Sequence, residues 1–231
     1  MKKSVILFAA ILMMTGSVVF SQAVRDRNVI PIAVNLNQVL RMSITNGGNI
    51  EFVFNTIDDY KNGLSADAAT SVSANPSTSE PMYKTDFTVG SSTRWALSYG
   101  AEEATFIGTD DPSKTLTLTN VGFTITNNGT NLFETGAKGT DATKALFSAP
   151  TDGAQEVAAL QIYPTLLIED NNTIIANAGD AADNSFTLEW RCGTAEAGAV
   201  VPMNTVKLID QNPSPAPDRY VVNVLFDLAI D

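Results

Sequence analysis

The sequence predicts an all-β protein, an immunoglobulin-like antiparallel β-sandwich of ten or more strands. Three observations lead to this prediction. Apolar and β-branched residues alternate with polar residues in short runs, turn-forming residues separate the runs, and helical periodicity is scarce. Antiparallel sandwiches and barrels are built from many short strands joined by such turns.

The alternating runs are predicted to be strands along most of the chain. They cover residues 49–54, 83–89, 95–99, 116–118, 121–125, 158–168, 173–176, 186–192, 203–209 and 220–230. Only residues 141–147 and 155–160 have the periodicity of short helical turns. Residues 65–81, rich in Ser, Ala and Thr, are predicted to form a long loop.

The first 23 residues have the three parts of a cleavable export signal. Lys2 and Lys3 give a positive start, residues 5–14 are apolar, and small residues precede Val24. A cut before Gln22 also fits the cleavage rule. Since the apolar run is shorter than the ~20 residues that span a bilayer, we expect a secreted or cell-surface protein with no membrane segment after cleavage.

Charge and composition argue against several partners and chemistries. Removal of the signal would change the formal net charge from −11 to −13, which disfavours binding to nucleic acid or to an anionic membrane. The chain has no histidine, which excludes histidine-based catalytic triads and histidine-ligated zinc. The sequence therefore predicts a non-enzymatic protein without a cofactor. The one cysteine, Cys192, lies in an alternating run that favours a buried thiol.

The chain is expected to have a signal peptide (1–23), an N-terminal extended arm or edge strand (24–37) and one β-sandwich domain (38–231). One face of the arm carries Ile30, Ile32, Val34 and Leu36. Pro31 lies on the other face and cannot donate a ladder hydrogen bond. This segment therefore belongs at a sheet edge or outside its own domain.

The last alternating segment places six apolar residues on one face: Tyr220, Val222, Val224, Phe226, Leu228 and Ile230. This pattern predicts a strand in the centre of a sheet. We expect residues 30–36 of one subunit to enter a groove beside this strand in a neighbour, because exported fibre subunits can assemble by strand addition. The alternative, which alternation alone does not separate, is an ordinary first strand of the same domain.

Three other kinds of site are possible from residue types alone. Acidic turns could bind Ca²⁺, although none has EF-hand spacing, and such residues are commonly turn formers. A carboxylate pair drawn from Glu102, Glu103 and Glu189 could hydrolyse glycosides. Trp95 and Trp190 could bind a sugar, but tryptophans on strand faces more often fill a core.

Two short motifs carry a family resemblance. Trp95-Ala96-Leu97, and Phe226-Asp227-Leu228 after Tyr220, resemble the two motifs of the WxL surface domains. Residues 48–52 resemble the opening strands of that family and of spore-coat-U-like fimbrial domains. The resemblance implies an immunoglobulin-like sandwich at the cell surface, with Trp95, Leu97, Phe226 and Leu228 as the matching positions. Phe226 stands where WxL domains have a second tryptophan, which puts their peptidoglycan binding in question here.

The function predicted from the sequence is therefore structural. We expect an exported, non-catalytic subunit of a cell-surface filament, fimbria or coat that self-associates by N-terminal strand donation. The alternative is a secreted or wall-associated module for glycan binding or adhesion.

Overall fold

A computed structural model describes residues 30–66, 83–131, 157–169, 177–196 and 201–230. The chain divides into two units, Met1–Leu36 and Asn37–Asp231. The described residues of the first unit, 30–36, contain no helix or strand. All described helices and strands belong to the second unit.

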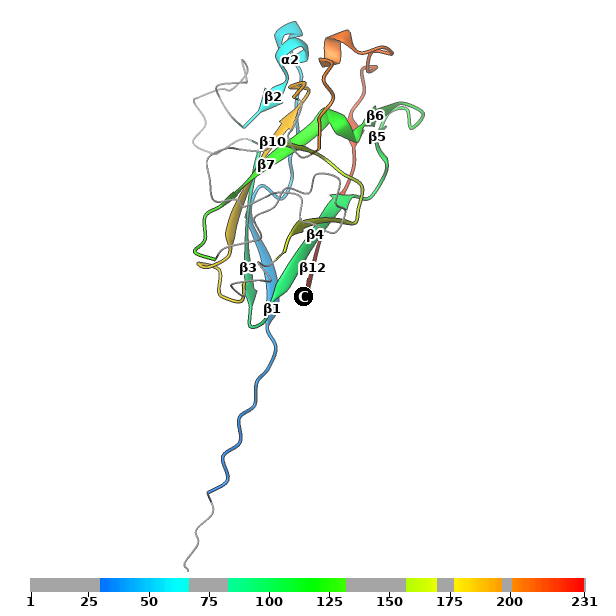
Figure 1. Cartoon of the computed structure of the whole chain (residues 1–231). Helices are drawn as coiled ribbons and strands as arrows, with labels where there is room; N and C mark the ends of the chain where they lie inside the picture. Colours follow the sequence, from blue (N-terminus) through cyan, green and yellow to red (C-terminus); the bar gives the residue numbers. More distant parts are fainter. Residues whose placement is uncertain (1–29, 67–82, 132–156, 170–176, 197–200, 231) are drawn as a thin grey trace, which may run out of the picture. The chain divides into compact units, whose positions relative to one another are not determined.

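The described part of the second unit contains twelve strands, one α-helix and two 3-10 turns (Figure 1). The elements are β1 (Leu40–Asn46), α2 (Ile57–Asn62), β2 (Leu64–Ser65), β3 (Lys84–Ser91), β4 (Trp95–Ala101), β5 (Thr105–Gly108), β6 (Thr115–Thr117), η1 (Leu118–Asn120), β7 (Val121–Asn127), β8 (Ala158–Ala159), β9 (Thr165–Ile168), β10 (Ser185–Cys192), η2 (Leu208–Asp210), β11 (Tyr220–Val221) and β12 (Val224–Ile230).

The strands form three sheets. The largest has the order β1-β3-β10-β7-β8, with β2 also paired to β10, and the two smaller sheets are β12-β4-β9 and β11-β5-β6. Every ladder between these strands is antiparallel. The predicted all-β, antiparallel, sandwich-like class is thus confirmed.

The core lies beneath β3, β10, β7 and β4. Alternate residues of β3 and β10 point into it, because successive side chains of a strand face opposite ways. Phe87 and Phe186 stack with ring centroids 5.0 Å apart, and Tyr99 meets Phe123 edge-on at 5.2 Å. All four rings have no exposed surface, so aromatic packing joins strands of the two sheets.

Asn177 holds the start of β4 in this core. Its side chain accepts a hydrogen bond from the main-chain N–H of Trp95 (3.0 Å) and donates one to the Trp95 carbonyl (2.7 Å). The Trp95 indole Nε1 donates to the main-chain carbonyl of Asn177 (2.8 Å). Both residues have no exposed surface, so the Asn177 side chain satisfies two main-chain groups of Trp95 inside the core.

Several predicted elements were wrong, and the reasons are local. Residues 203–209 form a loop and the turn η2 rather than a strand, and residues 50–54 form no strand. At residues 158–159, where a strand and a helical turn were both predicted, the structure has the strand β8. The helix α2 was not predicted, although Thr56 and Asp59 form a capping box at its start. Residues 141–147 and 173–176 lie outside the described residues, as does most of the predicted loop 65–81.

The prediction for the C-terminal strand also needs correction. The ladder is interrupted at Val222 and Asn223, which separates β11 from β12. β12 pairs only with β4 among the described strands and lies at the edge of its sheet, not at its centre. Its inward side chains are accordingly half-buried.

We predict that Asn177→Ala lowers the free energy of unfolding by about 2–4 kcal/mol, because it leaves two buried main-chain groups of Trp95 without these hydrogen bonds. Urea unfolding of the variant measures the change. Asn37→Ala, at an exposed position, is the control and should leave the midpoint unchanged. Equal midpoints for the two variants would contradict the role given to Asn177.

Candidate functional site

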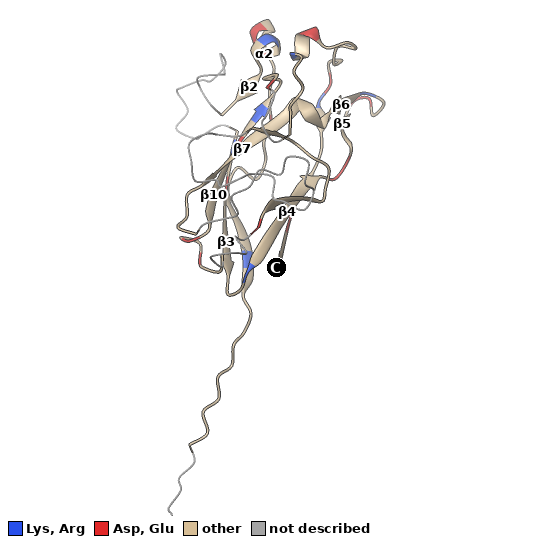
Figure 2. Cartoon of the chain, in the orientation of Figure 1, with Lys and Arg blue, Asp and Glu red and all other residues tan. Residues whose placement is uncertain are grey.

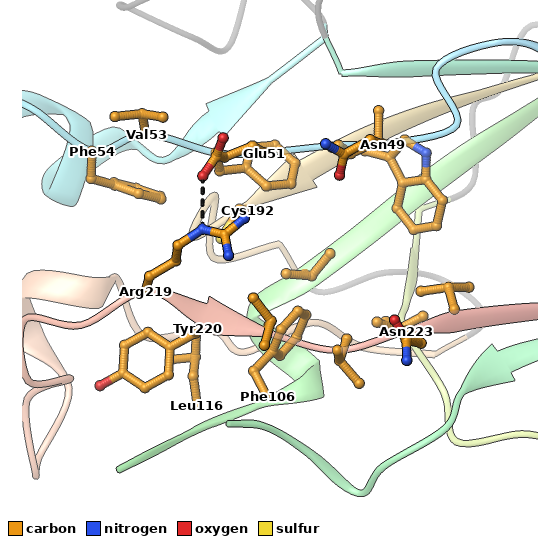
Figure 3. A pocket seen from close by; sticks show the side chains of 18 of the residues that line it. Asn49, Glu51, Val53, Phe54, Phe106, Leu116, Cys192, Arg219, Tyr220 and Asn223 are labelled. Carbon is orange, nitrogen blue, oxygen red and sulfur yellow. Dashed lines mark hydrogen bonds and ion pairs between the residues drawn. The ribbon is translucent and has the colours of Figure 1, made fainter. Parts of the chain in front are cut away.

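An open groove of about 800 Å³ lies between two extended segments of the second unit (Figure 3). One wall is formed by residues 47–54, which follow β1. The other is formed by residues 215–224, which contain β11 and lead into β12. Both walls are parts of the chain where strand pairing is missing or interrupted.

The first wall has the side-chain pattern of a strand but has no partner strand. Ile50, Phe52 and Phe54 are half-buried, whereas Glu51 and Val53 between them are exposed. No main-chain hydrogen bond joins residues 49–54 to another part of the described chain. This wall therefore offers free N–H and C=O groups beside a row of apolar side chains.

Gly47 explains why the chain leaves the large sheet here. The β1–β3 register is already irregular between Ile44 and Asn46, and Gly47 has φ +65°, a conformation that favours glycine. A Cβ at this position would clash with the carbonyl of Lys84 on β3. The first wall thus separates from β3 at Gly47, where the backbone conformation and the contact with Lys84 both require glycine.

The second wall repeats the pattern of the first. Tyr220, Val222, Val224 and Phe226 line the groove and are half-buried, while Val221 and Asn223 between them are exposed at its rim. Phe226 reaches the core, with ring centroids 6.0 Å from Phe87 and 6.4 Å from Tyr99. β12 has one free edge within the described sheets.

The floor between the walls is apolar. It includes Phe106, Leu116, Trp190 and Cys192. Trp190 donates from its indole nitrogen to the Thr85 hydroxyl (3.0 Å), so its polar atom is already satisfied. Burial raises the pKa of the Cys192 thiol to about 12, which keeps the sulfur uncharged at neutral pH.

One ion pair crosses the rim. Arg219 Nε donates to Glu51 Oε1 at 3.1 Å, which joins the two walls (Figure 3). Both side chains are more than half exposed, so the pair contributes little to stability. Asp218 fixes the second wall more firmly, because its carboxylate accepts from the main-chain N–H groups of Asp110 and Asp111, and these bonds hold its pKa below the usual range.

The predicted groove residues and the predicted arm residues are found in different units. Tyr220, Val222, Val224 and Phe226 line the groove, and Leu228 continues the same face of β12. In the arm, Ile30, Ile32, Val34 and Leu36 are 81%, 85%, 75% and 90% exposed. They take part in no described strand.

The alternative site residues have ordinary structural roles. Trp95 has no exposed surface and Trp190 is buried in the groove floor with its indole nitrogen bonded to Thr85. Glu189 of β10 forms an ion pair with Lys84 of β3. Glu102, which follows β4, accepts a hydrogen bond from the side chain of Asn223. No cluster of three or more potential metal ligands occurs among the described residues.

The two motifs behind the WxL resemblance lie side by side. β4 and β12 pair antiparallel, with Leu97 opposite Leu228 and Tyr99 opposite Phe226. Trp95 and Leu97 have no exposed surface. The chain matches no known protein-family profile, and no characterised protein is detectably similar to it in sequence. Within the described residues, no helix has the length and apolar character needed to cross a membrane.

Sequence reasoning found the second wall but missed the first as part of the site. Residues 50–54 were identified by their alternation, yet nothing in the alternation says whether a partner strand is present. The Gly47-Gly48 pair that takes this segment off the sheet is the sequence signal that could have indicated it.

We predict that Cys192 resists alkylation by iodoacetamide in the folded protein at about pH 8, because its thiol is buried and its pKa is raised to about 12. Intact-mass spectrometry after a timed reaction measures this. The same protein in concentrated guanidinium should be labelled fully. Rapid labelling under native conditions would mean that the groove floor opens to solvent.

Proposed function

We propose that this protein is an exported, non-catalytic structural subunit that assembles into a cell-surface filament, fimbria or coat by strand donation. The arm of one subunit, residues 30–36, enters the groove of a second copy. The observation that carries the proposal is the groove, whose two walls have strand-like alternation but have no strand of the described chain between them.

The arm and the groove are complementary in shape and polarity. The arm presents four apolar side chains at alternate positions, and the groove is lined by apolar residues at alternate positions on both walls. A strand of seven residues is about 23 Å long, and β12 itself has seven residues. Insertion would cover the half-buried residues of both walls and satisfy their free main-chain groups.

Export is part of the proposal and is supported by the sequence of the first 23 residues. Cleavage before Val24 would leave only six residues ahead of Ile30. Signal removal therefore gives a short arm with a free end, which can thread into a groove.

We predict that Ile32→Asp abolishes assembly of the mature protein, because a carboxylate would have to be buried in an apolar groove. Electron microscopy and size-exclusion chromatography measure filament formation. Ala33→Asp is the matched control, because it adds the same charge to the opposite face of the arm and should still assemble. Filaments from Ile32→Asp, or no filaments from wild type under any condition, would overturn the proposal.

A second experiment uses the Ile32→Asp chain as an acceptor. A synthetic peptide of residues 28–37 should raise its melting temperature in a concentration-dependent way, because the ligand binds only the folded state. The same peptide carrying Asp in place of Ile32 should have no effect. A protein that instead binds peptidoglycan or a glycan array saturably, and is unaffected by either peptide, would be the glycan-binding module.

A further inference from the structure

The two ends of the second unit differ in how they meet the arm. The arm leaves this unit at a fixed point, because Val39 exchanges hydrogen bonds with Ser92 in the β3–β4 turn, at 2.9 Å from Val39 N to Ser92 Oγ and 2.9 Å from Ser92 N to Val39 O. We call this end, formed by residues 37–39 and 92–94, the base. The other end, formed by α2 and residues 206–210, we call the pole (Figure 1).

The groove opens at the pole. Tyr60 of α2 and Leu208 of η2 both line the groove, and α2 contacts η2. β12 runs from the groove toward the base, where Ile230 lies opposite Trp95, the residue that follows the β3–β4 turn. A strand in the groove can therefore run in one of two directions, toward the pole or toward the base.

We propose, on the basis of the function proposed above, that the inserted arm runs antiparallel to β12, and that the base of the donor consequently docks on the pole of the acceptor. The pairing sense is the first argument. Every ladder between the named strands is antiparallel, the parallel pairings among the described residues being two isolated bridges, and antiparallel pairing is slightly more stable per residue. β12 is a regular strand with a free edge, whereas residues 50–54 form no strand.

The connection between the arm and the donor's second unit is short, so the direction of the arm determines which parts of the two subunits touch. In the antiparallel sense, Leu36 lies opposite Tyr220, at the pole end of the groove, and Ile30 lies opposite Phe226, the last residue of the acceptor's β12 that lines the groove. Only two residues separate Leu36 from Val39, which is fixed to the donor's β3–β4 turn. A chain of this length reaches about 11 Å, so the donor's base must lie against the acceptor's pole.

The pole has the surface that such a contact needs. Ile57, Val206, Ile209 and Tyr60 are 66%, 43%, 41% and 37% exposed, and they are adjacent to the groove opening through α2 and η2. The donor's base contributes Val39, which is 57% exposed. α2 also carries Asp58 and Lys61, and η2 carries Asp210 (Figure 2), and polar residues beside apolar ones are usual at an interface rim.

The same geometry prevents the arm from filling the groove of its own chain. Antiparallel pairing would require Leu36 to lie at the pole while Val39 stays at the base. These ends are separated by roughly the length of the inserted strand, about 23 Å, which is twice the reach of the connection. The arm is therefore available only to another copy, and assembly is head to tail.

Cross-linking tests the direction. A donor carrying Asn37→Cys is mixed with an acceptor carrying Ile32→Asp, which cannot donate its own arm, together with either Ile209→Cys at the pole or Ile230→Cys at the base. A short bis-maleimide is added, and tandem mass spectrometry identifies the linked peptides. We expect the link between positions 37 and 209 to exceed the link between 37 and 230 at least tenfold.

The possible outcomes separate the two proposals. A dominant link between 37 and 230 means that the arm runs the other way and overturns the pole contact, while strand donation stands. If neither link forms, although filaments of the wild-type protein depend on Ile32, the pole contact is overturned and strand donation stands. Filaments that do not depend on Ile32 overturn strand donation itself.

Discussion

The free edge of β12 is the constraint on which the rest of the structure depends. An unpaired strand edge presents main-chain donors and acceptors that readily pair with another chain, and proteins normally cover, shorten or charge such edges. Here β12 has seven residues, and the groove beside it is apolar. The facing wall, residues 50–54, is also unpaired. Two unsatisfied edges that face one groove have a common solution, which is one added strand.

The core explains how the domain tolerates an open groove. Phe87, Tyr99, Phe123 and Phe186 have no exposed surface. They are on β3, β4, β7 and β10, and each of these strands has a partner strand on both sides. Both walls carry half-buried apolar residues, which also occur on β1 and at Val201. Because burial is complete under the central strands, stability resides there, and the groove can remain open without loss of the fold.

Strands were predicted well from the sequence where one face of the strand is buried and the other is more exposed. Burial alternates along β3 and along most of β4 and β10, because one side of each faces the core. The same alternation at residues 50–54 and 220–230 could not show that the first segment forms no strand or that β12 has a partner on one side only among the described strands, because a side-chain pattern reports burial and not hydrogen bonding. The position of β12 at an edge was missed for that reason. The helix α2 was missed because its signal is a capping box rather than an apolar stripe.

In the proposed assembly, Pro31 indicates which wall the arm would pair with fully. In a β-strand, the N–H and C=O of one residue point to the same neighbour, and those of the next residue point to the opposite neighbour. Ile30, Ile32, Val34 and Leu36 therefore direct their main-chain groups to one wall, and Pro31 shares the other direction with Ala33 and Asn35. Proline removes one donor from that second direction alone. The complete set of main-chain groups suits β12, a regular strand, and the incomplete set suits the irregular wall of residues 50–54. The asymmetry of the arm thus matches the asymmetry of the groove.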